Sequence, residues 1–476
     1  MTRREAIAAL AAPAVLRGAR RPGDKPNVLF LWTDEQRADT LAVHGNTRFK
    51  LPVLNRLASD SAVFERCYVS QPVCTPSRSC VMTGLWPHQT GCLNNNIPLK
   101  RDIRTMPELV NDSAYRTGYM GKWHLGDEVF AQHGFEDWAS IEDGYNKYYS
   151  PGRDANAKSS YHHHLLKLGY KPPGGKDRFS RDFAVRRVIE HCKPAFLAAE
   201  ASRFLLAHSG DPFILYVNFL EPHMPFFGPL NDLHTEEEAP VPQNYPGDKV
   251  DREPKSYIEK REGFLKNGFG GQDLKTRAGW QRLNRNYAGL CSQVDAALGR
   301  ILWALEASGQ AENTIVVFTS DHGEMMGAHT LVGKSVMYEE AMRVPLMVRA
   351  PFRGQKPEVR RGSYSHADLV PSLLDLLGKK ADGLPGHSWF APHSAQGDVF
   401  SQWNTESGEA NARTIITQEG LKLVQHDKDN CLLFDRRNDP LEANNLYYKA
   451  QHQKTVSELR KRLEGQLKRT SDGFPA

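Results

Sequence analysis

The stretch Val28-Leu-Phe-Leu-Trp-Thr33 decides the fold class, because it is a continuous apolar run that stops at Asp34 and Glu35. Three more apolar runs also stop at polar residues: 117–121 before Lys122 and His124, 213–220 before Glu221 and His223, and 314–319 before Ser320, Asp321 and His322. Runs that are continuous rather than alternating are typical of strands buried on both faces of a parallel sheet.

Helical patterns separate these runs, for example over residues 287–305 and 368–377. Strands that alternate with helices predict an α/β fold with a large doubly wound sheet, mixed but mainly parallel, flanked by helices. Ligands of such sheets bind beyond the carboxyl ends of the strands. The polar residues that end the four runs are therefore candidate site residues.

A smaller C-terminal α+β domain is predicted over residues 385–476. Short strands are expected at 414–417, 422–424 and 431–434, followed by a helix with one apolar face made of Val456, Leu459, Leu463 and Leu467. Residues 25–384 then form the main domain.

Cys74 lies in the segment Pro72-Val-Cys-Thr-Pro-Ser-Arg78. Pro76 suits the first turn of a helix, where its missing N–H costs nothing, so Cys74 is expected just before a helix N-terminus. Free N–H groups and the helix dipole favour an anion there, and Arg78 adds a fixed cation. These residues predict a nucleophile at an anion site; the alternative is a buried structural cysteine.

Cys74-Thr-Pro-Ser-Arg78 resembles the Cys-x-Pro-Ser-Arg signature of the type I sulfatases, which belong to the alkaline phosphatase-like superfamily. Other blocks resemble the family in the same order: 26–34, 121–126, 320–324, 333–334, 338–345 and 433–446. The resemblance covers about residues 26–450. It implies a sulfuric ester hydrolase with an alkaline phosphatase-like fold.

The resemblance implies that Cys74 is oxidised to formylglycine by a formylglycine-generating or an anaerobic sulfatase-maturating enzyme. It also implies one divalent metal, calcium first, held by Asp34, Glu35, residue 74, Asp321 and His322. Magnesium and manganese are the alternative metals, because imidazole is a softer ligand than carboxylate. Glu35 stands where many members carry an aspartate, and the alternative for it is a surface glutamate.

Catalytic roles follow from the same resemblance. Arg78 and Lys122 hold the formylglycine hydrate and, with Lys334 and the metal, neutralise the sulfate. One hydroxyl of the hydrate attacks sulfur, and His223 or Lys334 protonates the leaving alcohol. His124 then takes the proton of the second hydroxyl, and sulfate is expelled. A packed histidine and a solvated lysine are the alternatives for His223 and Lys334.

Three functions remain open at this point. The first is a sulfatase that acts on a sulfated glycan or saccharide. The second is a phosphodiesterase or phosphonate monoester hydrolase of the same superfamily. The third is a non-enzymatic glycan-binding relative, against which the complete set of catalytic residues argues.

The formal net charge of the 476 residues is +5, but residues 1–21 hold five arginines against one glutamate. Arg3 and Arg4 followed by the apolar run 6–16 predict a twin-arginine export signal, and hence a periplasmic or secreted protein; the alternative is a frayed basic terminus. The remaining chain is nearly neutral, so no nucleic-acid partner is expected. No apolar window is long enough to predict a membrane span.

Three features remain unassigned. Residues 151–193 carry ten basic against four acidic residues, which fits either a site for a sulfated polymer or a solvated surface. Residues 236–271 are rich in proline, glycine and charge and predict a long loop or an insertion near the entrance. Residues 161–164 (Tyr-His-His-His) are interpreted as a polar stretch that rims the pocket. Besides Cys74, six cysteines remain whose pairing the sequence does not define.

Overall fold

The computed structural model describes residues 25–475 except 248–249, 392–396, 406–407 and 409. The predicted export signal over residues 1–21 lies outside the described residues. Within them, no helix is both long and apolar enough to cross a membrane.

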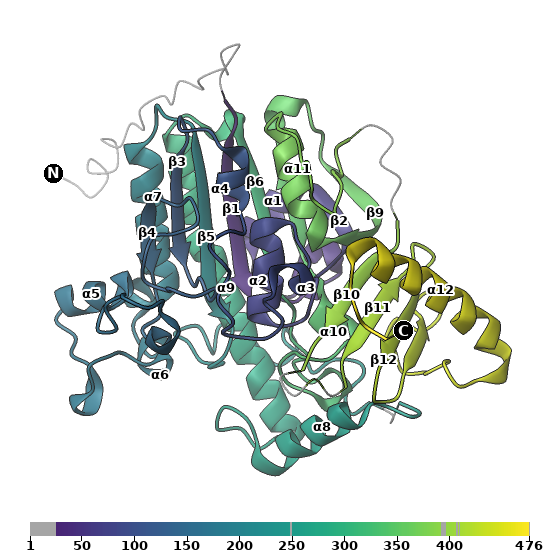
Figure 1. The fold of residues 1–476 in the computed structure, drawn as a ribbon. Helices are drawn as coiled ribbons and strands as arrows, with labels where there is room; N and C mark the ends of the chain where they lie inside the picture. Colours follow the sequence, from purple (N-terminus) through teal and green to yellow (C-terminus); the bar gives the residue numbers. More distant parts are fainter. Residues whose placement is uncertain (1–24, 248–249, 392–396, 406–407, 409, 476) are drawn as a thin grey trace.

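The main domain is built on a nine-stranded mixed sheet, with strand order β4-β3-β5-β1-β6-β8-β2-β7 and β9 paired with β2 (Figure 1). The strands are β1 Asn27–Asp34, β2 Ala62–Tyr68, β3 Arg116–Gly121, β4 Asp137–Ser140, β5 Phe213–Pro222, β6 Thr314–Ser320, β7 Arg343–Val344, β8 Leu346–Arg349 and β9 Glu358–Ser365. The four predicted runs became β1, β3, β5 and β6. These four are neighbours and run parallel, which confirms the predicted fold class.

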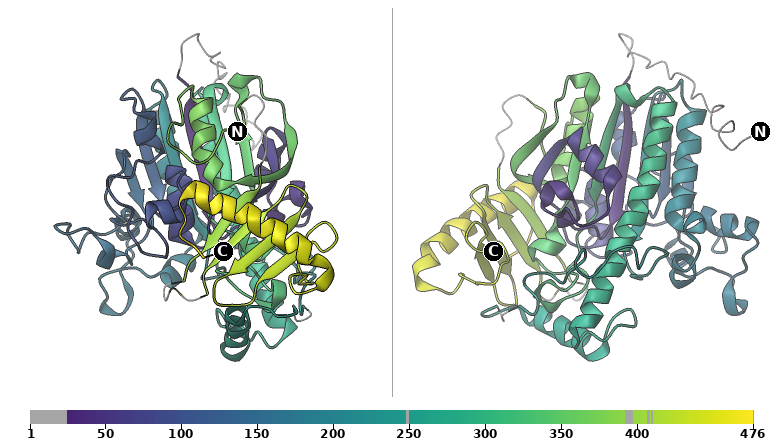
Figure 2. Two further views of the ribbon diagram at one scale, coloured as in Figure 1. Left: turned by 45° about the vertical axis from the view of Figure 1, so that its right-hand side comes forward. Right: turned by 180° about the vertical axis from the view of Figure 1, so that it is seen from behind.

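β1 is buried on both faces, as its continuous apolar sequence predicts. Leu29 and Leu31 pack in one core with residues of α7 and α9, whereas Phe30 and Trp32 pack in a second core with residues of α2 and α11. Helices therefore cover both faces of the sheet, with α7 and α9 on one side and α2 and α11 on the other (Figure 2).

The helices have the following bounds: α1 Pro52–Ser59, α2 Cys74–Thr83, α3 Pro87–Thr90, α4 Met106–Val110, α5 Ser160–Lys167, α6 Arg181–Val185, α7 Lys193–Ala207, α8 Lys255–Asn267, α9 Arg277–Ala307, α10 Glu339–Met342, α11 Leu369–Leu376 and α12 Gln453–Thr470. The helical patterns over 287–305 and 368–377 correspond to α9 and α11.

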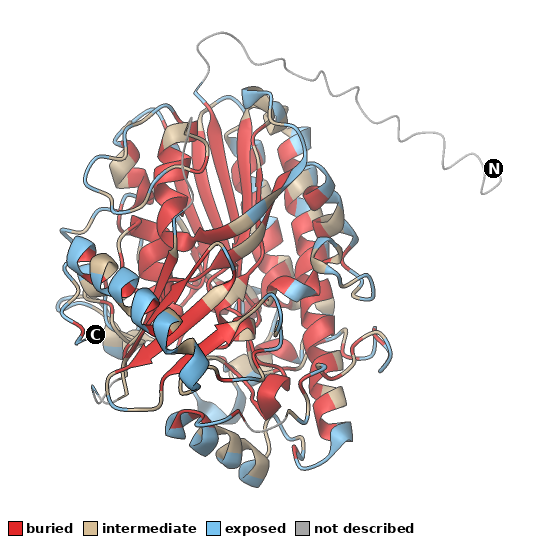
Figure 3. Cartoon of the chain, turned by 90° about the vertical axis from the view of Figure 1, so that its right-hand side faces the viewer, coloured by how far each residue is buried: buried red, intermediate tan, exposed pale blue. Residues whose placement is uncertain are grey.

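The C-terminal part is a four-stranded antiparallel sheet, order β10-β11-β12-β13, covered by α12. Its strands are β10 Val399–Trp403, β11 Ala412–Ile416, β12 Leu421–His426 and β13 Leu432–Asp435. The four apolar residues predicted on one face of α12 are all buried, and the outer face of this helix is exposed (Figure 3). The α+β architecture is as predicted, with β10 as an additional strand.

One interpretation of a surface segment needs correction. Residues 236–271 are not only loop, because α8 lies within them. Pro254 precedes this helix and Gly268 follows it with a φ of 70°, which are the usual start and stop residues. Residues 161–164 belong to α5, where Tyr161 and His162 are buried and line a hollow, and His162 Nδ1 lies 2.7 Å from Asp143. All seven cysteines are buried and unpaired in the structure.

Candidate active site

Four parallel neighbours deliver polar residues to one edge of the sheet. Asp34 ends β1, Lys122 follows β3, His223 follows β5 and Asp321 follows β6. Because the strands are adjacent and parallel, their carboxyl ends meet at one edge. The structure thus brings together residues from positions nearly 300 apart in the sequence.

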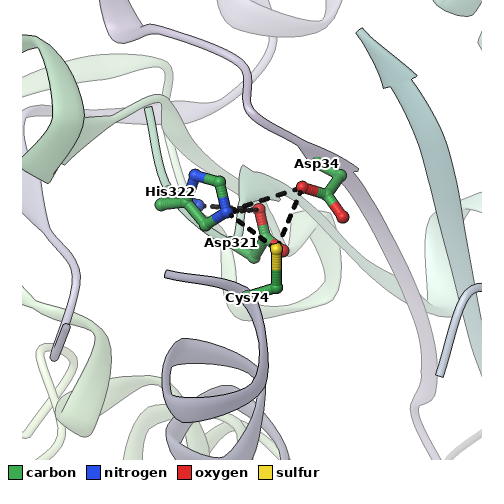
Figure 4. Close-up of side chains that lie close together, drawn as sticks. All are labelled: Asp34, Cys74, Asp321 and His322. Carbon is green, nitrogen blue, oxygen red and sulfur yellow. Dashed lines mark hydrogen bonds and ion pairs between the residues drawn. The ribbon is translucent and has the colours of Figure 1, made fainter. Parts of the chain in front are cut away.

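Cys74 is the first residue of α2, and its side chain points at this edge (Figure 4). The first turn of α2 is held by hydrogen bonds from the backbone N–H of Thr75 to Asn95 Oδ1 (3.0 Å) and from the Thr75 hydroxyl to the carbonyl of His124 (2.9 Å). The first N–H groups of a helix have no partner within the helix, so the position favours an anionic oxygen on residue 74.

Asp34, Cys74, Asp321 and His322 form a buried cluster whose ligand atoms all lie within 4.8 Å of one another. Cys74 Sγ is 3.2 Å from His322 Nε2 and 3.8 Å from Asp34 Oδ1 (Figure 4). His322 Nδ1 lies 2.9 Å from the carbonyl of Gly323, which can only accept, so Nδ1 carries the proton and Nε2 presents a lone pair to the cluster. Two carboxylates and one such imidazole fit a divalent cation.

Glu35 lies at the border of this cluster and forms a second group with Asp34 and His223. One of its carboxylate oxygens, Oε1, is bonded to the Lys334 ammonium and is 3.3 Å from His223 Nε2. The other, Oε2, is buried without a hydrogen-bond partner. An orphaned buried carboxylate oxygen beside Asp34 fits a cation in the cluster, and Glu35 is not the surface residue of the alternative interpretation.

Arg78 lies beneath the cluster and is completely buried. Its guanidinium donates to Asp321 Oδ2 at 2.9 Å, Asp34 Oδ2 at 2.8 Å and Asn218 Oδ1 at 2.9 Å, and also to the carbonyl of Lys122. Arg78 therefore holds the two metal-facing carboxylates in place, and it does not line the open pocket.

Lys122 and Lys334 both line the pocket that contains residue 74, and they have different partners. Lys122 Nζ is 2.5 Å from Asp34 Oδ2 and 3.8 Å from Cys74 Sγ. Lys334 Nζ is 3.0 Å from His223 Nε2, while His223 Nδ1 donates to the carbonyl of Met224. His223 Nε2 is therefore an acceptor for the Lys334 proton, and the two residues share it.

His124 is held on both its backbone and its ring. Its N–H donates to Glu128 at 2.7 Å, and its ring Nε2 donates to Asn96 Oδ1 at 2.9 Å. Nδ1 then has the lone pair and is buried without a partner. This nitrogen can therefore accept a proton.

The surroundings shift the pKa values of these groups. Burial raises the pKa of the Cys74 thiol to about 12, so an unmodified Cys74 is a neutral thiol. Burial, assisted by Lys122, holds the pKa of His124 well below its usual range and keeps the ring neutral. Burial would raise the pKa of Asp34, but Lys122, His223 and Arg78 outweigh it and hold this pKa well below the usual range.

The open pocket above Cys74 gathers five of the predicted catalytic residues: Cys74, Lys122, His124, His223 and Lys334. It also contains Asn95, Asn96, Tyr145 and Arg181, which the sequence analysis did not single out. Asn95 and Asn96 belong to a run of three asparagines (94–96), and Asn218 interrupts the apolar run of β5. The asparagine run and the polar residue within an apolar strand are the sequence signals that could have identified these residues.

A residue at a helix N-terminus that faces an Asp, Asp and His cluster, at the carboxyl edge of a mainly parallel sheet, defines a hydrolase of the alkaline phosphatase-like superfamily. The family model for sulfatases matches residues 26–379, and that for the C-terminal part of N-sulphoglucosamine sulphohydrolase matches residues 327–469. The chain belongs to the sulfatase family and is a sulfuric ester hydrolase.

Two similar relatives illustrate this membership, and one solved structure shares the fold. An N-acetylglucosamine-6-O-sulfatase of Bacteroides thetaiotaomicron is 27% identical, over 98% of this chain and 91% of the relative. The uncharacterized sulfatase YidJ of Escherichia coli is 30% identical, over 89% of this chain and 83% of the relative. The phosphonate monoester hydrolase of Silicibacter pomeroyi shares the fold, with a TM-score of 0.79 at 24% identity over 94% of this chain and 96% of that chain.

Proposed function

We propose that this protein is an exported sulfatase that removes a sulfate ester group from a sulfated saccharide, with Cys74 converted to formylglycine and a divalent metal, calcium first, beside it. The observation that carries the proposal is the position of Cys74 in a pocket that is also lined by three lysines and two histidines. The name of one similar relative, N-acetylglucosamine-6-O-sulfatase, supports a saccharide as substrate.

The surroundings of residue 74 support its modification. An ionised thiol is disfavoured there, since burial raises its pKa to about 12. The N-terminus of α2 and the Lys122 ammonium, 3.8 Å from Sγ, instead favour an anionic oxygen at this position. Formylglycine, as its hydrate, supplies two hydroxyl groups, one for attack on sulfur and one whose proton loss allows sulfate to leave.

Asp34, Asp321 and His322 would hold the metal, with Glu35 as the additional carboxylate. When bound, the metal supplies positive charge opposite the sulfate oxygens. The chain contributes the orientation: Arg78 fixes the two aspartates, and Gly323 fixes the His322 ring.

Hydrogen bonds support the proposed proton steps. Lys334 and His223 share a proton 3.0 Å apart at the pocket, which suits the protonation of the leaving alcohol. His124 presents an unpartnered Nδ1 because Asn96 accepts from Nε2. It therefore suits removal of the proton from the second hydroxyl of residue 74.

The activity is tested on protein co-expressed with a formylglycine-generating enzyme. We expect release of inorganic sulfate from at least one monosulfated saccharide of a panel, and none by the variant Cys74→Ala. The matched control Cys92→Ala removes another buried cysteine, outside the pocket, and is expected to keep the activity.

A second candidate is hydrolysis of phosphonate monoesters or phosphate diesters, which the likeness in fold to the Silicibacter enzyme favours. Specificity constants on aryl sulfate and on aryl phosphonate esters of the same alcohol separate the two. A higher constant on the phosphorus ester would make the phosphonate monoester or phosphate diester the preferred substrate of this site.

Export is proposed from residues 1–21. Replacing Arg3 and Arg4 by lysine is expected to retain the protein in the cytoplasm of the native host, since twin-arginine transport requires the pair. Cell fractionation measures this. An unchanged distribution of the double variant would contradict twin-arginine export.

A further inference from the structure

A second hollow adjoins the candidate active-site pocket, and the two share Gly144, Tyr145 and Arg181 as lining residues. Its remaining wall comes from α5 and from the segment that leads into α6. Both helices lie at the same end of the molecule as the carboxyl ends of β3 and β4 (Figure 1). A ligand larger than the group at Cys74 can therefore extend from the pocket into this hollow.

The hollow has an excess of positive charge. Lys176, Arg178, Arg181 and Lys193 line it, against two acids, Glu142 and Asp143. Both acids already have partners: Glu142 pairs with Arg181 and Lys193, and Asp143 pairs with His162 at 2.7 Å.

Lys176 and Arg178 are the uncompensated cations. Both are exposed, and in the part of the chain that the structure describes neither has an ion pair with an acid. They belong to the basic stretch 151–193, to which the proposed reaction steps give no role. Two unpaired cations in a hollow favour an anionic ligand.

Arg181 connects the hollow to the reacting centre. Its Nε donates to Glu142 at 2.6 Å, and its Nη2 donates to the Tyr145 hydroxyl at 2.9 Å. The Tyr145 ring in turn lies 4.6 Å from the His124 ring. Nη1 of Arg181 has no hydrogen-bond acceptor among the described residues, and the Arg181 side chain is 29% exposed. Arg181 can thus contact a ligand without losing the bonds that hold it.

We propose that this hollow binds a second anionic group, a sulfate or a carboxylate, of the saccharide whose sulfate ester is cleaved above Cys74. Lys176 and Arg178 pair with that group, Arg181 donates from Nη1, and Tyr145 lies against the sugar between the two anions. The inference rests on the proposed function and narrows its substrate to a saccharide with more than one negative charge.

The contribution of this subsite is expected mainly in KM. Its contacts are remote from sulfur and are equal in the ground state and the transition state, which is uniform binding. Exposed charge pairs are screened by salt, so the preference should weaken as ionic strength rises.

The test compares a monosulfated disaccharide with the same disaccharide carrying a second sulfate. The double variant Lys176→Gln/Arg178→Gln is expected to reduce the ratio of kcat/KM, disulfated over monosulfated, by about tenfold. The matched control Lys167→Gln/Lys171→Gln removes two exposed charges of the same stretch outside the hollow and should keep the wild-type ratio.

The outcomes separate the two levels of the proposal. If the double variant has the same kcat/KM ratio, disulfated over monosulfated, as the wild type, the subsite is overturned. The sulfatase proposal is not affected by that result. A wild-type protein that releases sulfate from neither disaccharide overturns the sulfatase proposal, and the subsite with it.

Discussion

At the scale of single residues, Arg78 fixes the geometry of the site. One guanidinium joins Asp34 and Asp321, which come from two different strands, and it also bonds Asn218 from a third. All these groups are fully buried. A planar fork can hold two carboxylates at fixed angles, whereas an ammonium is a single point of charge.

The variant Arg78→Lys tests this role. We expect kcat/KM to fall by at least about a hundredfold, or roughly 3 kcal/mol, because one buried carboxylate loses its partner and turns away. Steady-state kinetics measure the loss. The control Arg413→Lys weakens another buried arginine, paired with Asp472 in the C-terminal domain, and should keep kcat/KM. Wild-type kcat/KM in Arg78→Lys would contradict the role.

The sequence predicts which residues belong to the site, but it does not predict how their side chains are oriented. Cys74 and Arg78 are one helical turn apart, so the sequence predicts that they lie near each other. It does not show that Arg78 points below the pocket toward Asp34 and Asp321, because this depends on strands far away in the chain. The same holds for Asn96, whose bond to His124 bridges two loops.

At the scale of elements, β3 ends in a close contact with β5 at the site. A Cβ atom on Gly121 would lie 1.9 Å from the backbone oxygen of Asn218 in β5, and its φ is 123°. Only glycine fits this position. The next residue is Lys122, so the close approach of β3 and β5 sets the position of its ammonium.

We therefore expect Gly121→Ala to lower the free energy of unfolding by at least about 2 kcal/mol and to lower kcat as well, since β3 must move away from β5. Denaturant unfolding and kinetics measure both. Gly210→Ala is the control, because a Cβ there meets no atom within 4 Å. Equal effects of the two variants would contradict this account.

Glu128 holds the loop after β3 by hydrogen bonds. It also makes the free energy of unfolding depend on pH. It accepts the N–H groups of Trp123 and His124, and burial raises its pKa from 4.5 to about 7. A raised pKa means that the folded state binds the proton more tightly, so stability falls as pH rises from about 4.5 through about 7.

The variant Glu128→Gln does not titrate at this position. The difference in free energy of unfolding, wild type minus Glu128→Gln, should therefore decrease by up to about 3 kcal/mol between pH 4.5 and 7.5. Urea unfolding at several pH values measures it. A difference that is constant or increases over this range would contradict a raised pKa.

The elements themselves were largely predictable. Continuous apolar runs identify β1, β5 and β6 because both faces of the sheet are buried. β10 has no such signal, since Ser401 and Gln402 stand in its centre. The strand bonds the segment before Cys74: the hydroxyl of Ser401 donates to the carbonyl of Val69 at 2.9 Å, and the backbone N–H of Gln402 donates to the carbonyl of Ser70 at 2.8 Å. The role of this strand follows from a long-range contact and not from periodicity.

At the scale of the whole molecule, the site joins both ends of the main domain. Asp34 comes from the first strand, Asp321 and Lys334 from the late part, and β10 of the C-terminal domain fastens the segment before Cys74. A cation among Asp34, Asp321 and His322 would therefore stabilise the global fold and not only a loop.

Metal removal tests this coupling. Treatment with a chelator is expected to lower Tm by several degrees and to stop sulfate release, and calcium should restore both. Thermal unfolding with elemental analysis of the metal content measures the effect. In Asp34→Asn the response of Tm to the chelator should be weaker. A metal-free protein with unchanged Tm and activity would contradict the metal site.

The central claim is that residue 74 acts as formylglycine. The most direct measurement prepares the protein with different levels of the formylglycine-generating enzyme and quantifies the modified peptide by mass spectrometry beside the rate of sulfate release. The account predicts a rate proportional to the modified fraction and negligible for unmodified Cys74. Full activity of protein in which Cys74 is entirely unmodified would contradict it.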